Sequence, residues 1–301
     1  KASSRAYQAL GSEGLAALCV PRSAADYRCV DAESYSRARG TLSLQESLEH
    51  IDQMPSAEEV EADFDFDAAY ADFSAGLVYM QEACGDMVWM PAQWRAGGRV
   101  TWYGDFGYEN FFYIVGAHPD RAQKLMEVGG ARGHCQARLV ARAVEAGLYP
   151  HAVLLGEDIC TQRGPMISPA FMENYYAPQL RRGLQPLLQV GCKPVWHSDG
   201  DVRPLLDMLL DCGIQGFQGF QPECGMDIEY MLAKQTREGR RLLIFGPLAV
   251  TTELPVWSAA QVRERVRQVV ELCRDRADLV LFTSNTINPD VPLDNIRAMH
   301  E

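Results

Sequence analysis

Short apolar strands alternating with helical segments are the feature that most constrains the fold of this chain. Helical patterns separate the apolar runs, and from residue 152 onward the runs recur about every 20–40 residues, a spacing typical of βα units. Strands that are apolar throughout are typical of a parallel sheet covered on both faces. The predicted strands are 87–90, 99–103, 152–155, 193–196, 214–217, 242–245 and 279–282.

The number of strands favours a closed α/β barrel. Seven strands can be read from the pattern, and we expect one more within the N-terminal region, whose periodicity is weak. The alternative is an open doubly wound sheet, but no G-x-G-x-x-G follows any predicted strand. We therefore predict a single-domain (β/α)8 TIM barrel over residues 61–301 with a shortened or atypical first unit. Residues 1–60 are predicted to be a segment of uncertain structure packed on the barrel.

The net charge and the cysteine content limit the kinds of partner and the cellular compartment that we expect for this chain. The net charge of -12 argues against nucleic acid and against an anionic membrane surface as partners. No apolar run reaches the roughly 18 residues of a membrane helix. The nine cysteines include no C-x-x-C pair, which predicts a reducing cytoplasm. The sequence leaves open whether the chain forms a homo-oligomer.

The segment His197–Gly200, which follows the strand over 193–196, is the sharpest candidate site. In α/β barrels, active sites are built from the loops at the carboxyl ends of the strands. His197 and Asp199 are two residues apart, so their side chains point to the same side. They can share a metal, or Asp199 can orient the imidazole and raise its basicity. The structural alternative is a strand-capping histidine beside an aspartate that caps the helix beginning near Asp201.

Other polar residues follow the neighbouring strands. Glu157 and Asp158 are adjacent and point in opposite directions, so we assign Asp158 to the site and Glu157 to a salt bridge. Cys160 and Cys224 lie in loops on either side of the His197 loop and could complete a zinc site, although a loop cysteine is more often a bystander. The predicted substrate-binding residues in these loops are Gln162, Arg163, Gln218 and Asn285.

Several segments together resemble the uroporphyrinogen decarboxylase superfamily, which also contains corrinoid-linked methyltransferases. The resemblance runs from about residue 45 to the end and rests on Tyr108–Gly116, Gly156–Asp158, Ile167–Phe171, His197–Gly200 and Ile287–Ile296. It implies a (β/α)8 barrel, in agreement with the strand pattern. It also implies that Glu109 and Tyr113, within the first of these segments, contact the substrate.

The chain departs from both branches of that superfamily. The decarboxylases carry an arginine-rich loop and an essential N-terminal aspartate without counterparts here, and Gly246–Ala249 lacks the acid of their corresponding segment. In the methyltransferases, a His-x-Cys pair and a later cysteine bind zinc. His197 matches that histidine, whereas Asp199 replaces the first cysteine and Asn285 falls near the second. The resemblance thus implies zinc or another divalent metal with a harder set of ligands.

Three functions follow as hypotheses. The favoured one is a methyltransferase-like enzyme that moves a methyl group between a small-molecule substrate and a corrinoid, with a corrinoid protein as partner. In it, His197 and Asp199 hold a divalent metal that polarises the substrate heteroatom, while Asp158 acts as acid or base. The second is a metal-free decarboxylase-type lyase in which Asp158 stabilises a cation and His197 moves a proton. The third is a non-catalytic binder of a corrinoid or tetrapyrrole.

Overall fold

The computed structural model describes residues 8–17, 42–219 and 221–301. Of the predicted N-terminal segment 1–60, residues 1–7 and 18–41 lie outside the described residues. The strands are β1 (Gly14–Ala17), β2 (Val88–Pro91), β3 (Ala152–Gly156), β4 (Cys160–Thr161), β5 (Gly164–Pro165), β6 (Lys193–His197), β7 (Gly216–Gln218), β8 (Leu243–Leu248) and β9 (Asp278–Thr283).

Parallel pairing organises the longer strands. Five of them form one parallel sheet in the order β3-β6-β7-β8-β9, and β1 pairs with β2 in a second parallel sheet. The segment after β2 is tied to β3, since the amide of Gln93 donates to the carbonyl of Leu154 over 2.7 Å. The predicted α/β class with parallel strands is therefore confirmed, including a strand in the N-terminal region. The closed eight-stranded barrel stays a prediction.

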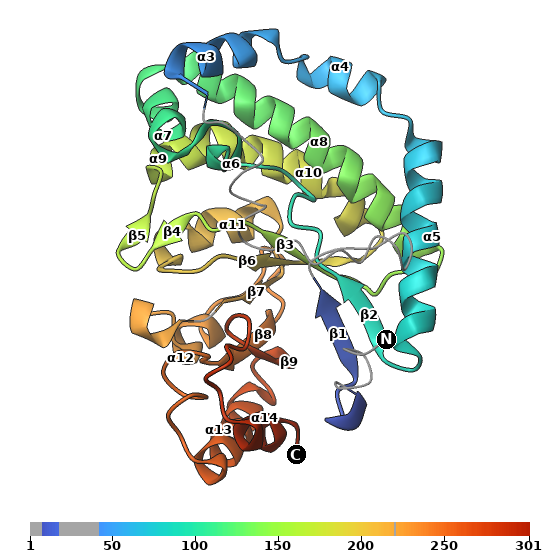
Figure 1. Ribbon diagram of the computed structural model, residues 1–301, viewed down its shortest axis with the longest axis vertical. Coiled ribbons are helices and arrows are strands. Elements are labelled where there is room, and N and C mark those ends of the chain that lie inside the picture. The colour runs from blue at the N-terminus through green and yellow to red at the C-terminus, as the bar shows by residue number, and fades with distance from the viewer. Residues whose placement is uncertain (1–7, 18–41, 220) are drawn as a thin grey trace.

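Helices flank these strands in the way expected of βα units. Figure 1 shows α8 and α10 side by side along one side of the strands, and α13 and α14 at the opposite end of the molecule. The helices are α3 (Leu44–Gln53), α4 (Ala57–Ala62), α5 (Phe66–Cys84), α6 (Tyr103–Phe106), α7 (Tyr108–Ala117), α8 (Pro119–Glu145), α9 (Pro169–Phe171), α10 (Ala177–Gln189), α11 (Leu206–Cys212), α12 (Ile228–Leu232), α13 (Ala259–Cys273) and α14 (Leu293–His300). A π-helical turn over Met172–Tyr176 joins α9 to α10.

The predicted strand over 99–103 is wrong. Residues 98–102 have no regular secondary structure, and Tyr103 begins α6. The amides of Val100 and Thr101 donate to the carboxylate of Glu157, over 2.7 and 3.1 Å, instead of to a neighbouring strand. This segment therefore lies in the core without joining a sheet, because the half-buried carboxylate of Glu157, which follows β3, accepts from its amides.

Glycines bring α8 and α10 close to the chain between β2 and α6. A Cβ at Gly183 of α10 would overlap the carbonyl of Gly97, and a Cβ at Gly133 of α8 would overlap the amide of Gly98. The amide of Gly97 also donates to the carbonyl of Gly133 over 3.1 Å. Residues 97–98 thus lie in direct backbone contact with two helices, and this close packing holds the segment that leads toward the site.

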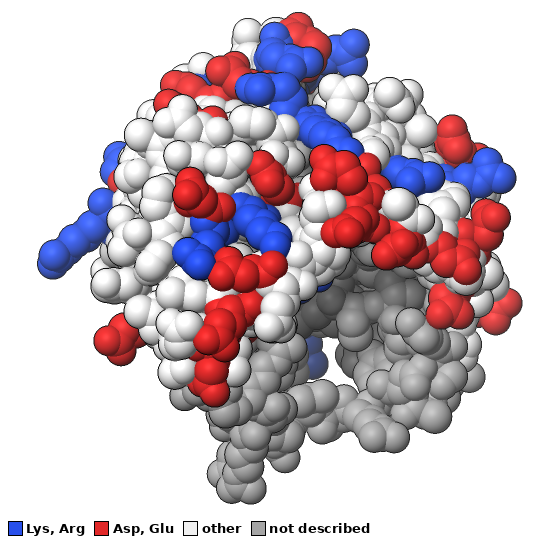
Figure 2. All heavy atoms as spheres, turned by 90° about the horizontal axis from the view of Figure 1, so that it is seen from above, with Lys and Arg blue, Asp and Glu red and all other residues white. Residues whose placement is uncertain are grey.

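The surface carries charges of both signs. Figure 2 shows Lys and Arg side chains interspersed with Asp and Glu on the face seen from above, without an extended basic area there. That distribution agrees with the net charge of -12. No helix in the described ranges combines the length and the apolar character needed to cross a bilayer.

Candidate functional site

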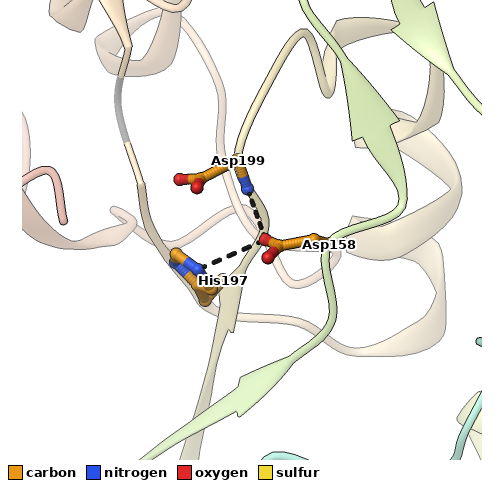
Figure 3. A group of neighbouring side chains, drawn as sticks. All are labelled: Asp158, His197 and Asp199. Carbon is orange, nitrogen blue, oxygen red and sulfur yellow. Dashed lines mark hydrogen bonds and ion pairs between the residues drawn. The ribbon is translucent and has the colours of Figure 1, made fainter. Parts of the chain in front are cut away.

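The carboxyl ends of β3, β6 and β7 lie level with one another. Gly156 pairs in register with His197, and His197 pairs with Gln218. Because parallel strands end at the same edge of a sheet, the residues that follow them meet there. Asp158 follows β3, His197 ends β6, and Asp199 lies two residues further on. Figure 3 shows these three side chains around one space.

Asp158, His197 and Asp199 form the core of the candidate site. The Nε2 atom of His197 lies 3.5 Å from Oδ1 of Asp158. The same oxygen accepts a hydrogen bond of 3.0 Å from the backbone amide of Asp199. The side chain of His197 is 14% exposed and that of Asp158 is 53% exposed. One potential ligand atom from each residue lies within 4.8 Å of the other two, the arrangement of a small metal site.

A second layer of hydrogen bonds holds the His197 loop in place. Nδ2 of Asn285 donates to both carboxylate oxygens of Asp199, over 3.0 and 2.8 Å. The hydroxyl of Ser198 donates to the carbonyl of Asp199 and accepts from the amide of Ile159. Both carboxylate oxygens of Asp199 are therefore oriented by Asn285, which follows β9. In the strand order of the sheet, β9 is the last strand, whereas Asp199 follows β6, the second strand.

Burial and charge shift the pKa values of the three groups in different directions. The hydrogen bond from His197 lowers the pKa of Asp158, in spite of burial. Burial lowers the pKa of His197, but the hydrogen bond to Asp158 and the charges of Asp158 and Asp199 together raise it above its ordinary value. Burial and the charge of Asp158 raise the pKa of Asp199. The result is an ionised Asp158 beside an imidazole that readily takes a proton.

Asp158→Asn should lower the pKa of His197, because it removes the charge of the carboxylate nearest to the imidazole. The His197 contribution to stability is fully present below its unfolded-state pKa of about 6.5 and is lost as the pH rises through the raised folded-state value. The Asp158 contribution is present above its unfolded-state pKa and is lost as the pH falls through the depressed folded-state value. NMR titration of the imidazole and unfolding at several pH values measure both effects.

The difference in unfolding free energy between the wild type and Asp158→Asn should peak between these two pH windows. It should stay below about 1 kcal/mol, because Asp158 is half exposed and water screens its charge. An unchanged His197 pKa in the variant would show that the two side chains are not paired in solution.

The structure brings some of the predicted residues to this site and leaves others apart from it. Asn285 contacts Asp199 directly, and Gln218 is buried beside His197 at the end of β7. Nε2 of Gln218 donates to the carbonyls of Thr283 and Ser284, over 2.9 Å each, so its amide group links β7 to the end of β9.

The other predicted substrate-binding residues are exposed. Gln162 and Arg163 lie in the turn between β4 and β5, and the amide of Arg163 donates to the hydroxyl of Thr161. Glu109 and Tyr113 lie on the exposed side of α7, where the ring of Tyr113 contacts His118. Among the described residues, no hydrogen bond or ion pair joins these four side chains to the three central ones.

Cys160 and Cys224 do not belong to the three-residue group. Within the described residues, the group of potential metal ligands consists of Asp158, His197 and Asp199. Cys160 is buried in β4, where burial raises the pKa of its thiol to about 12. Cys224 is also buried, and its thiol lies 3.7 Å from Oε1 of Gln221. A metal ligand must be a thiolate, so the environment of Cys160 disfavours that role.

The sequence patterns did not single out Trp94, a neighbour of the site. The ring of Trp94 lies 5.4 Å from that of His197, with the planes inclined by 58°. Trp94 comes three residues after β2. Its position behind a strand end is the sequence feature that points to a place near the site. Glu157 accepts hydrogen bonds from the amides of Val100 and Thr101 and from the hydroxyl of Thr101, a backbone-holding role in place of the predicted salt bridge.

The three central residues suit a divalent cation. Two ligand atoms bound to one ion at about 2.0–2.2 Å lie about 3.4 Å apart in a tetrahedral arrangement. The separation of 3.5 Å between His197 Nε2 and Asp158 Oδ1 fits this value. Nδ1 of His197 is buried and, among the described residues, has no hydrogen-bond partner. An imidazole and two carboxylates are a ligand set that divalent metals accept.

Comparisons with known proteins bear on the fold. No protein-family model matches the sequence, and a search of curated proteins gives no match. Among solved structures, the chain is similar to a methyltransferase from Methanosarcina mazei, with a TM-score of 0.54 and 17% sequence identity. The match covers 76% of this chain and 62% of the other, so this chain spans less than two thirds of that methyltransferase. The likeness shows that the two proteins share a fold.

Proposed function

We propose that this chain is a divergent member of the uroporphyrinogen decarboxylase superfamily that transfers a methyl group between a small substrate and a corrinoid. The observation that carries the proposal is the convergence of Asp158, His197 and Asp199 at the carboxyl ends of β3 and β6. The fold shared with a methyltransferase supports it. We further propose that residues 61–301, together with β1, close into a (β/α)8 barrel.

Each central residue has a role in the proposed transfer. In the direction of demethylation, the bond between the methyl carbon and the substrate heteroatom breaks and a carbon–cobalt bond forms. The reduced corrinoid supplies the electron pair of the new bond, and the heteroatom leaves with the old pair and takes a proton. The raised pKa of His197 and the neighbouring Asp158 carboxylate suit this pair to deliver that proton.

His197, Asp158 and Asp199 are also the residues that would hold a zinc or other divalent ion. Such an ion supplies Lewis-acid polarisation of the heteroatom when bound. Asp199 is held for this purpose by Asn285, and Asp158 by the amide of Asp199. Nε2 of His197, which faces Asp158, holds either a proton or the ion, so a bound ion would take the place of the imidazole proton.

The charge balance of the site favours methyl transfer over decarboxylation of a tetrapyrrole. Within the described ranges, neither Asp158 nor Asp199 forms an ion pair with a Lys or Arg. A substrate that carries several carboxylates needs cationic partners, and these carboxylates would repel it. The site therefore suits a neutral or cationic substrate.

The test is methyl transfer to free cob(I)alamin as a stand-in for the corrinoid protein. The purified protein is supplied with a divalent metal and with a panel of simple methylated compounds: alcohols, ethers, thioethers and amines. We expect formation of methylcobalamin, followed by its absorbance, with at least one member of the panel. Corrinoid binding without turnover of any compound would instead favour the non-catalytic binder.

A further inference from the structure

We infer that the candidate site takes a hard divalent cation and a methyl group carried by oxygen, in an alcohol or ether, and that Asn285 is the positioning residue that holds Asp199 toward this cation. The inference rests on the proposed methyl transfer and names its substrate class. The supporting observations are the chemistry of the donor atoms and the contacts of Asn285, all among the described residues.

Asn285 orients Asp199, and both polar ends of its side chain form hydrogen bonds. Its Nδ2 atom donates to both oxygens of Asp199. Its side-chain oxygen accepts from the amide of Thr286 over 2.6 Å, and its backbone carbonyl accepts from the hydroxyl of Thr283 over 2.7 Å. Both polar ends of the Asn285 side chain are thus hydrogen-bonded. The amide group that holds Asp199 is uncharged, so it does not neutralise the negative charge of the Asp199 carboxylate.

The donor set around this space is hard. It comprises carboxylate oxygens from Asp158 and Asp199 and one imidazole nitrogen from His197. Carboxylates suit hard cations such as manganese, and imidazole suits iron as well as zinc, whereas thiolates select softer ions. The two nearest loop cysteines, Cys160 and Cys224, are buried and stand outside this group. No soft ligand is therefore presented by the described part of the site.

A hard cation matches an oxygen atom in the substrate better than a sulfur atom. In the proposed step, the bond from the methyl carbon to oxygen breaks, and the oxygen keeps the electron pair and is protonated, to water from methanol or to an alcohol or phenol from an ether. The reduced corrinoid provides the pair for the carbon–cobalt bond, so cobalt(I) becomes methyl-cobalt(III). Trp94, 5.4 Å from the ring of His197, offers an apolar surface for the carbon skeleton of the donor.

Metal titration of the full chain, without any substrate, tests the donor set. Mn²⁺, Co²⁺ and Cd²⁺ are titrated into metal-free protein by calorimetry, and the Co²⁺ form is examined for thiolate-to-cobalt charge-transfer absorption. We expect binding without that band. Asn285→Ala should weaken Mn²⁺ binding about 10–100-fold, because Asp199 would lose the hydrogen bonds that orient its carboxylate toward the cation. Asn288→Ala, an exposed change in the same loop, is the matched control and should bind as the wild type does.

Asp199→Cys provides the converse test. It places a thiolate donor in the site, so the preference for Cd²⁺ over Mn²⁺ should rise by at least about tenfold and the charge-transfer band should appear. Cys160→Ser and Cys224→Ser should leave metal affinity unchanged. A thiolate band in the wild type that disappears in either cysteine variant, or Mn²⁺ affinity unaffected by Asn285→Ala, would overturn the inference.

The methyl donors separate this inference from the proposed function. With cob(I)alamin as acceptor, methanol and anisole are compared with methanethiol and dimethyl sulfide. We expect turnover of an oxygen compound and at least about tenfold less with its sulfur counterpart. Preferred turnover of a sulfur compound would refute the substrate class and leave methyl transfer intact. Hard-metal binding without turnover of any methyl donor would refute the proposed function and leave the metal assignment intact.

Discussion

His197→Ala is expected to lower the rate of methyl transfer by about 10²–10⁴-fold, the usual contribution of a positioned acid–base group. The imidazole stands between the carboxylates of Asp158 and Asp199, which together raise its pKa. Its loss removes the group that, at Nε2, holds either the proton or one coordination position of a metal. The effect should appear in kcat more than in KM, because the lost group acts on the reacting atoms while the ring of Trp94 is left in place.

His151→Ala is the matched control for this change. His151 is exposed and precedes β3 at the opposite end of that strand from Asp158, so its removal should not alter the rate. The pH–rate profile adds a second readout, since the wild type should show an ionisation above the ordinary histidine range that the His197 variant lacks. A variant that retains the wild-type rate and profile would place the chemistry elsewhere in the molecule.

Gly183→Ala is expected to lower the unfolding free energy by about 2–3 kcal/mol, the upper part of the usual range for overpacking. The new Cβ would overlap the backbone carbonyl of Gly97, and a backbone atom cannot rotate away as a flexible side chain can. Helix α10 would have to move outward from residues 97–98, and it packs along α8 and β6. Urea unfolding followed by fluorescence measures the change.

Gly116→Ala is the companion variant that separates crowding from helix propensity. Gly116 lies in α7, is exposed, and a Cβ there meets no atom within 4 Å. Since Ala favours the interior of a helix over Gly, this change should leave stability unchanged or raise it by up to about 1 kcal/mol. Equal effects of the two substitutions would rule out steric crowding at Gly183 as the cause.

The sequence predicts the parallel α/β class because strand ends and helices leave clear periodic patterns. It also predicts the place of the candidate site, since His197 and Asp158 both follow apolar strands. It fails at 99–103, where the amides of Val100 and Thr101 donate to Glu157 and not to a strand. A pattern of apolar residues reports burial, and burial alone does not reveal which partner satisfies the backbone.

Long-range side-chain contacts are the part of the site that patterns cannot reveal. Asn285 and Asp199 are 86 positions apart, and only the order of the strands brings them together. Trp94 reaches His197 in the same way, from the segment after β2. Cys160 and Cys224 show the converse. Their segments lie on either side of the His197 loop along the chain, but their thiols are not among the central ligand atoms.

The buried amide of Gln218 has a consequence for how this protein can be altered. It donates from the end of β7 to the carbonyls of Thr283 and Ser284, and the hydroxyl of Ser284 in turn accepts from the amide of Val250. The loops after β7, β8 and β9 are thereby cross-linked into one rim. A loop grafted from another protein would break these links unless its neighbours were exchanged with it, so new specificity in this protein must be introduced by changing several loops as a set.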